Sequence, residues 1–247
     1  MSTPELVFRR GAVRPGECLS DAWVLVKDQY WLFVGMCAVG LLIASAIPLG
    51  ILMGPMMCGL YIAFFKRRRG EPIEFGMLFK GFDYFGPSVV ATLLHVVPIL
   101  VVVIPAYILF YVFFLLSAVA QGNDPNPGPM LGVMVMFVIF WIVMFIAITF
   151  LSIGFTFVYP LIVDRKLPAF DAVKWSFKAA LANFWGLLLL MLLTGVLLGC
   201  GMLLCYVGMF LVFPIQYAAI AIVYEKVFGL SDPNQMVSNL PPPPPSF

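Results

Sequence analysis

The stretch that decides the fold is Met130–Val163, MLGVMVMFVIFWIVMFIAITFLSIGFTFVYPLIV, which contains no Lys, Arg, Asp or Glu. Three further blocks are equally free of these residues, namely Trp31–Phe65, Ser88–Asn123 and Phe184–Tyr224. About 20 apolar residues are enough to cross the hydrocarbon core of a bilayer. Each block therefore predicts at least one transmembrane helix, and the first and last are nearly long enough for two.

The composition of the whole chain agrees with these blocks. Of its 247 residues, 63% are hydrophobic and only 11% are charged, whereas soluble globular proteins carry about 25% charged residues. The net charge is only +2, so the chain lacks the basic surface that nucleic-acid binding requires. The composition excludes a soluble enzyme and a disordered protein, and we expect no nucleic-acid partner.

The positions of the basic residues predict how often each block crosses. All 14 Lys and Arg residues lie in four zones, which are Arg9–Lys27, Lys66–Lys80, Arg165–Lys178 and Lys226. Basic residues of short loops stay on the cytoplasmic side. The first and last blocks should therefore cross an even number of times, and the two middle blocks once each. The simplest solution is six transmembrane helices with both termini in the cytoplasm.

Turn signals stand where this topology needs them, at Pro48–Gly50, Gln121–Pro129 and Gly199–Gly201. The weakest span is Ile51–Phe65, whose 15 residues give a helix of only about 23 Å. A true span and a re-entrant hairpin both remain open for this segment. The first 30 residues contain eight charged residues and no cleavable apolar region, so we expect no signal peptide. We therefore expect the plasma (inner) membrane of a bacterium.

An internal repeat is predicted from the segments that precede the hairpins. Each carries an apolar stripe at helical spacing and a charged opposite face. The stripes are Leu19, Ala22, Trp23, Val26 and Tyr30; Leu78, Phe82 and Phe85; and Phe170, Val173, Phe177, Leu181 and Phe184. We expect amphipathic helices in the cytoplasmic interface, where they touch membrane lipid. Two interpretations remain open: they lead into the next span, or they bind a protein partner or a second copy of the chain.

The predicted organisation follows from these patterns. An all-α membrane protein is expected, with a cytoplasmic N-terminal segment at 1–16 and a single six-span domain at 17–228. The domain consists of three repeats of interfacial helix plus transmembrane hairpin, at about 17–66, 72–165 and 168–226. The remaining residues, 229–247, form a Pro-rich tail that we expect to be disordered in the cytoplasm.

Several short motifs resemble those of a known group. They are Phe65–Pro72, Phe79–Phe82, Asp164–Pro168, Ala172–Lys178 and Asn183–Trp185. Residues 17–228 resemble a broad group of uncharacterised bacterial integral membrane proteins, which is similar to the membrane domain attached to some glycerophosphodiester phosphodiesterases. The resemblance implies a six-helix membrane fold. It implies no activity, because the chain contains no phosphodiesterase domain.

Residues able to do chemistry are sparse. His95 is the only ionisable group expected within the span cores, and a packing role suits it better than titration. The five cysteines lack zinc-ligand spacing, although Cys200 and Cys205 flank a predicted outside turn and either pair or pack. We therefore predict no catalytic, cofactor-binding or metal-binding residue, and no enzyme activity.

Other features inside the spans have ordinary structural explanations. Two small-xxx-small pairs, Gly50/Gly54 and Gly195/Gly199, suit close helix packing. Prolines that interrupt the spans are Pro55, Pro98, Pro105 and Pro214, and the polar residues nearby are Thr149, Ser152, Thr156, Thr194 and Gln216. Such residues mark a transport site or simply satisfy a kinked backbone.

Three functions remain in competition. The leading hypothesis is a non-enzymatic structural, assembly or partner-binding role. The alternative is a transporter or channel for a small or lipid-like solute, suggested by parallel repeats and Pro-interrupted spans. A lipid-acting enzyme comes third and requires Asp164, Arg165, Glu225 or His95 to converge.

Overall fold

The computed structural model describes residues 6–46, 50–121, 128–203 and 207–231, and within these ranges the secondary structure is helical without any strand. The elements are α1 (Pro15–Val26), η1 (Lys27–Gln29), α2 (Tyr30–Ser45), α3 (Met53–Arg68), η3 (Phe75–Tyr84), α4 (Phe85–Gln121), α5 (Gly128–Phe155), α6 (Val158–Arg165), α7 (Ala169–Ala182), α8 (Phe184–Leu203) and α9 (Val207–Phe228). The all-α prediction is confirmed. The middle interfacial segment differs from expectation, because η3 is a 3₁₀ helix.

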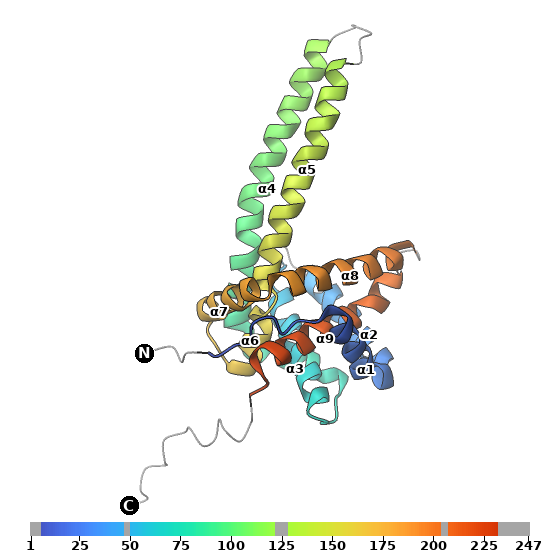
Figure 1. Ribbon diagram of the computed structural model, residues 1–247, viewed down its shortest axis with the longest axis vertical. Helices are drawn as coiled ribbons and strands as arrows, with labels where there is room; N and C mark the ends of the chain where they lie inside the picture. The colour runs from blue at the N-terminus through green and yellow to red at the C-terminus, as the bar shows by residue number, and fades with distance from the viewer. Residues whose placement is uncertain (1–5, 47–49, 122–127, 204–206, 232–247) are drawn as a thin grey trace, which may run out of the picture.

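The molecule consists of a helical body and a long hairpin that projects from it (Figure 1). The hairpin is formed by α4 and α5, which lie side by side, while α8 runs across its foot. At 1.5 Å per residue, the 37 residues of α4 extend about 55 Å, well beyond the roughly 30 Å of a hydrocarbon core. The foot of α4 is anchored in the body, where Ser88, Ala91 and Thr92 are buried.

Within the described residues, five helical stretches are long and apolar enough to cross a membrane. They are Pro15–Ser45, Phe75–Val119, Leu131–Arg165, Phe184–Leu203 and Gly208–Phe228. The expected sixth span corresponds to α3, which has only 16 residues and falls short of the length that a span requires. The six-span count and the threefold repeat therefore remain predictions.

The core of the body is built around α3. Eleven of its residues are buried, and it contacts α2, η3, α4, α6 and α9. The Phe33 and Phe64 rings stack with centroids 4.7 Å apart. Gly59 and Gly81 allow η3 to lie directly on α3, because a Cβ at Gly59 would collide with the Leu78 backbone and one at Gly81 with the Pro55 backbone. Small residues thus bring two backbones into contact, as in other membrane helix pairs.

The third apolar block is one stretch in sequence but two helices in space. The chain breaks between α5 and α6, at Thr156 and Phe157, and Ser176 of α7 repairs the break. Its Oγ accepts from Phe157 N at 3.1 Å and donates to Gly154 O at 2.6 Å. Because Ser176 is fully buried, two backbone groups that would otherwise lack partners are satisfied.

The turns show one difference from expectation. Gly199–Gly201 lies inside α8, and the described helix continues to Leu203. In addition, Pro168 is the N-cap of α7, and Lys166 ends α6 in the left-handed region with φ 52°. Most of the other predicted turn residues, Pro48, Leu49 and 122–127, lie outside the described residues.

The amphipathic helices pack into the body instead of lying free on its surface. In α7 the buried face consists of Ala172, Trp175, Ser176, Ala179 and Ala180, whereas Phe170 and Leu181 of the predicted stripe are exposed. Apart from Trp175, the residues on the buried face are small, which lets α7 approach α5 and α6 closely. The large apolar residues Phe170 and Leu181 face away from the body.

The N-terminal segment also belongs to the body. Arg9 N donates to Val227 O at 2.9 Å. The Asn183 side chain accepts from Ala12 N at 3.0 Å and donates to Arg9 O at 3.1 Å. Residues 9–12 are therefore held against the α7–α8 junction and α9.

Candidate functional site

The basic run at the end of α3 connects three different elements. Arg67 pairs with Asp28 of η1 at 2.7 Å, and Arg68 pairs with Glu225 of α9 at 2.5 Å. Arg69, the next residue, lies 3.5 Å from Asp164 of α6. Consecutive residues of a helix end point in different directions, so each guanidinium reaches a different neighbour. The hydrogen bond from Arg68 to Glu225 raises the pKa of the arginine, which stays charged.

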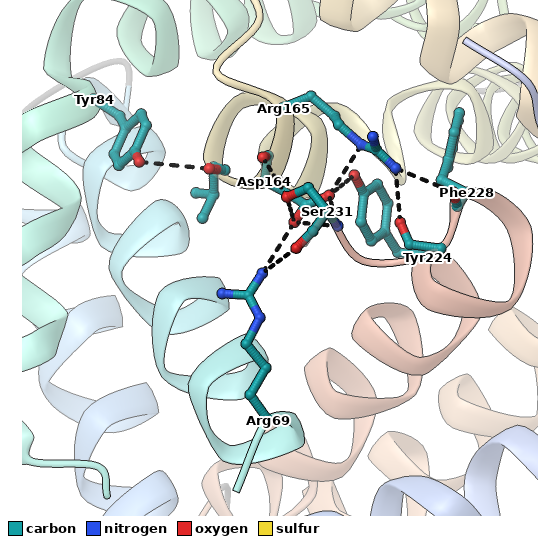
Figure 2. Close-up of polar contacts among 9 residues, drawn as sticks. Arg69, Tyr84, Asp164, Arg165, Tyr224, Phe228 and Ser231 are labelled. Atoms are coloured by element: carbon teal, nitrogen blue, oxygen red, sulfur yellow. Dashed lines mark hydrogen bonds and ion pairs between the residues drawn. The ribbon is translucent and has the colours of Figure 1, made fainter. Parts of the chain in front are cut away.

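Asp164 is the most enclosed charge of this group, with a side chain that is 0% exposed (Figure 2). Its Oδ2 accepts from the Tyr224 hydroxyl at 2.7 Å. Its Oδ1 lies 2.7 Å from Ser231 Oγ, and Ser231 N donates to both carboxylate oxygens at 3.2 Å. A buried carboxylate is tolerated only when it is paired and hydrogen-bonded in this way.

Two arginines surround the carboxylate and hold the chain that leaves α9 (Figure 2). Arg69 Nη2 donates to Ser231 O at 3.0 Å. Arg165 Nη2 donates to Phe228 O at 3.2 Å and to Gly229 O at 3.0 Å, while its Nε lies 3.2 Å from Asp164 Oδ2. The last carbonyls of a helix lack partners within the helix. Here Arg165 supplies the partner for Phe228.

We use the term Asp164 centre for the group of residues joined by these contacts, namely Arg69, Asp164, Arg165, Tyr224 and Ser231. Both oxygens of the carboxylate are engaged by groups of the protein. A general base must reach the proton that it removes, and here those directions are occupied by Tyr224 and Ser231. The arrangement joins α3, α6 and α9 and fixes the position at which the C-terminal segment begins.

The four residues of the enzyme hypothesis do not form one group. Asp164 and Arg165 meet in the Asp164 centre, whereas Glu225 pairs with Arg68. His95 stacks on Phe155, with ring centroids 4.4 Å apart, and its Nε2 is buried without a hydrogen-bond partner. The predicted packing role of His95 agrees with this position.

The prolines are less disruptive than the sequence suggests. Pro55 lies in the first turn of α3, where a missing N–H costs nothing. Pro98 and Pro105 lie within a continuous α4 on its exposed part, and Pro214 is buried within α9. Thr156, just after α5, donates to Ser152 O of that helix at 3.2 Å, and Thr194 donates to Leu190 O of its own helix at 2.9 Å.

The cysteines and the polar groups give no His, Cys, Asp or Glu cluster of three or more in the part of the chain that the structure describes. Cys37 and Cys58 are buried in α2 and α3, and Cys200 is exposed on α8. Cys205 lies outside the described residues. The Cys200–Cys205 pairing therefore stays a prediction.

The close glycine contact of the last hairpin differs from the one expected. A Cβ added to Gly195 or Gly199 would meet nothing within 4 Å, whereas one at Gly201 would lie 2.8 Å from the Gly208 backbone. Gly54 of the first pair does lie in a close contact, with Ser88 O 2.5 Å from its added Cβ. Gly201 and Gly208 were missed because they lie on two helices, and a spacing rule within one helix cannot pair them.

Sequence reasoning also did not predict that four polar residues connect separate elements, namely Ser176, Asn183, Tyr224 and Ser231. Each acts on a partner that is distant in sequence, and all four side chains are uncharged. Comparisons with protein-family models, with curated proteins and with solved structures found no match to this chain.

Proposed function

We propose that this chain is a non-enzymatic integral membrane protein with a structural, assembly or partner-binding role in the inner membrane of a bacterium. The observation that carries the proposal is the α4–α5 hairpin. Most of its large apolar side chains are exposed from Val97 to Leu116 and from Leu131 to Phe150, with Val133 and Met144 as buried exceptions. Water does not tolerate a continuous apolar surface of this extent, so lipid or another protein covers it.

The charge distribution supports the same proposal. Lys66, Arg67, Arg68, Arg69 and Lys226 all pair with acids of this chain, and all of these pairs except Lys66–Glu71 join separate elements. These pairs connect α3 and α9 to the neighbouring elements of the body. A rigid body fixed to a membrane-embedded hairpin is suited to positioning a partner.

The partner surface that we propose is the exposed side of the amphipathic helices. Phe170 and Leu181 of α7 are 69% and 54% exposed, and Trp23 of α1 is 48% exposed. Large exposed apolar residues rimmed by charged ones mark sites of contact with a membrane surface or a protein. Trp23, Phe170 and Leu181 can contact either the membrane surface or a protein partner, because we place α1 and α7 at the cytoplasmic interface.

The test is site-specific photo-cross-linking in intact cells, with a photoreactive residue at Phe170 or Leu181. A discrete protein adduct is expected at these positions. A matched position on the hairpin, Leu109, is 72% exposed and should give lipid adducts only. Absence of a protein adduct at Phe170 and Leu181, together with a monomer free of partners in mild detergent, would argue against the proposal.

The alternative function, transport of a small or lipid-like solute, now depends mainly on Pro214. Pro55 lies in the first turn of its helix, where its missing N–H frees no carbonyl, and Pro98 lies on the exposed part of α4, whereas Pro214 is buried. Flux in reconstituted vesicles decides between the two functions. Transport that falls when Pro214 is replaced by Ala, but not when Pro98 is, would favour the alternative.

A further inference from the structure

A small cavity of about 10 Å³ lies between α2 and α3. Five of the residues that line it carry sulfur, namely Met36, Cys37, Met53, Met56 and Met57. A volume of this size holds one water molecule or one ion. A water molecule needs two to four polar partners, and this lining is almost entirely apolar apart from Tyr217 and the thiol.

The sulfur-bearing residues converge because of their spacing on the two helices. Met53, Met56 and Met57 stand at i, i+3 and i+4 in α3, which places them on one face. Met36 and Cys37 are adjacent in α2, and Gly40 one turn later faces Met56 of α3, because a Cβ added to Gly40 would lie in ordinary contact, 3.7 Å from Met56 Cβ. Met36, Cys37 and Met56 are at most 2% exposed.

Methionine often fills gaps in a core, because its side chain is flexible. Gap filling alone explains neither a cavity that stays open nor five sulfur side chains around it. Thioether and thiolate ligands select Cu(I), whereas Mg²⁺ and Ca²⁺ require oxygen ligands. We propose that this cavity binds a soft monovalent metal ion, Cu(I), for which Ag(I) is a surrogate.

The charge balance of the site fits a monovalent ion. Metal binding to a cysteine releases the thiol proton, which leaves for bulk solvent. One Cu(I) and one Cys37 thiolate then sum to zero charge, so the filled site buries no net charge among apolar side chains. A divalent ion would leave a positive charge without a counterion, because the lining contains no second cysteine and no carboxylate.

The position of the cavity suits entry from one end of the body. Met53 begins α3 and Ala44 stands near the end of α2, and both line the cavity. The site therefore lies at the end of α3 opposite the Arg67–Arg69 run. An arriving cation meets no repulsion from those arginines.

The test is anaerobic titration of the purified full chain in mild detergent with Cu(I), in competition with a chromophoric Cu(I) chelator. One Cu(I) per chain is expected, with sulfur as its only ligand type in X-ray absorption. Met56→Leu and Cys37→Ser should each weaken binding by at least roughly 10- to 100-fold, since that loss already follows when a group that only orients a metal ligand is removed.

Suitable controls keep the test decisive. Leu has nearly the volume of Met, so Met56→Leu preserves packing, and its folding is checked by circular dichroism. Met134→Leu and Cys18→Ser change the same residue types outside the cavity, on α5 and α1, and should leave binding unchanged. A chain that binds no Cu(I), or whose affinity is indifferent to both cavity variants, would overturn the proposal, as would oxygen or nitrogen ligands.

Discussion

Arg69 Nη2 contacts Asp164 and Ser231 at once, lying 3.5 Å from the carboxylate Oδ1 and 3.0 Å from the Ser231 carbonyl. A residue at the end of α3 thus links the end of α6 to the segment that follows α9. The run Arg67–Arg69 predicts topology by its charge. The structure gives these arginines a second role, since each pairs with an acid of a different element.

The first prediction concerns the charge of Asp164. Asp164→Asn keeps the shape of the side chain but leaves Arg69 and Arg165 without their anion. Breaking a buried pair costs about 3–5 kcal/mol, and we expect about 3 kcal/mol because both arginines reach solvent. Their side chains are 29% and 28% exposed. The measurement is unfolding by SDS titration in mixed micelles.

Asp83→Asn is the matched control, because Asp83 is exposed and makes no ion pair among the described residues. Its free energy of unfolding should stay within about 0.5 kcal/mol of the parent. Equal stability of the two variants would show that the Asp164 centre does not hold the body together.

The second prediction concerns the break between α5 and α6. Ser176→Ala removes the hydroxyl that serves both Gly154 O and Phe157 N. Leaving such buried groups without partners costs about 1–3 kcal/mol, which the same SDS titration would detect. Ser117→Ala is the control, since the Ser117 hydroxyl is exposed and bonds only to Phe113 O of its own helix. A loss no larger than that of the control would contradict the assignment.

How far the sequence predicts this molecule depends on the range of the interactions. Helix type follows from local apolar runs, so the all-α fold is predictable from Met130–Val163 alone. The burial of α3 is not, because Gly59 and Gly81 act by contacting backbone of another element. The Asp164 centre is hidden for the same reason: no local pattern pairs Asp164 with Tyr224 or Ser231.

The third prediction separates glycines that pack from glycines that do not. Gly201→Ala should weaken the α8–α9 contact, since its Cβ would lie 2.8 Å from the Gly208 backbone. We expect a loss of about 1–3 kcal/mol from this overpacking. Gly195→Ala meets nothing within 4 Å and should be neutral or stabilising by up to about 1 kcal/mol. If Gly195→Ala lost more stability than Gly201→Ala, the interpretation of Gly195 and Gly199 as close-packing residues would be supported instead.

The last prediction concerns the orientation in the membrane, on which the placement of α1 and α7 depends. Asn126 lies between α4 and α5 in sequence, and Lys174 lies on α7. The basic residues of α7 predict that Lys174 is on the cytoplasmic side. In a background with Cys200 and Cys205 replaced by Ser, Asn126→Cys should react with a membrane-impermeant maleimide in intact cells. Lys174→Cys, at an exposed position, should react only after permeabilisation. Labelling of Lys174→Cys in intact cells would invert the topology and move the proposed partner surface to the opposite side.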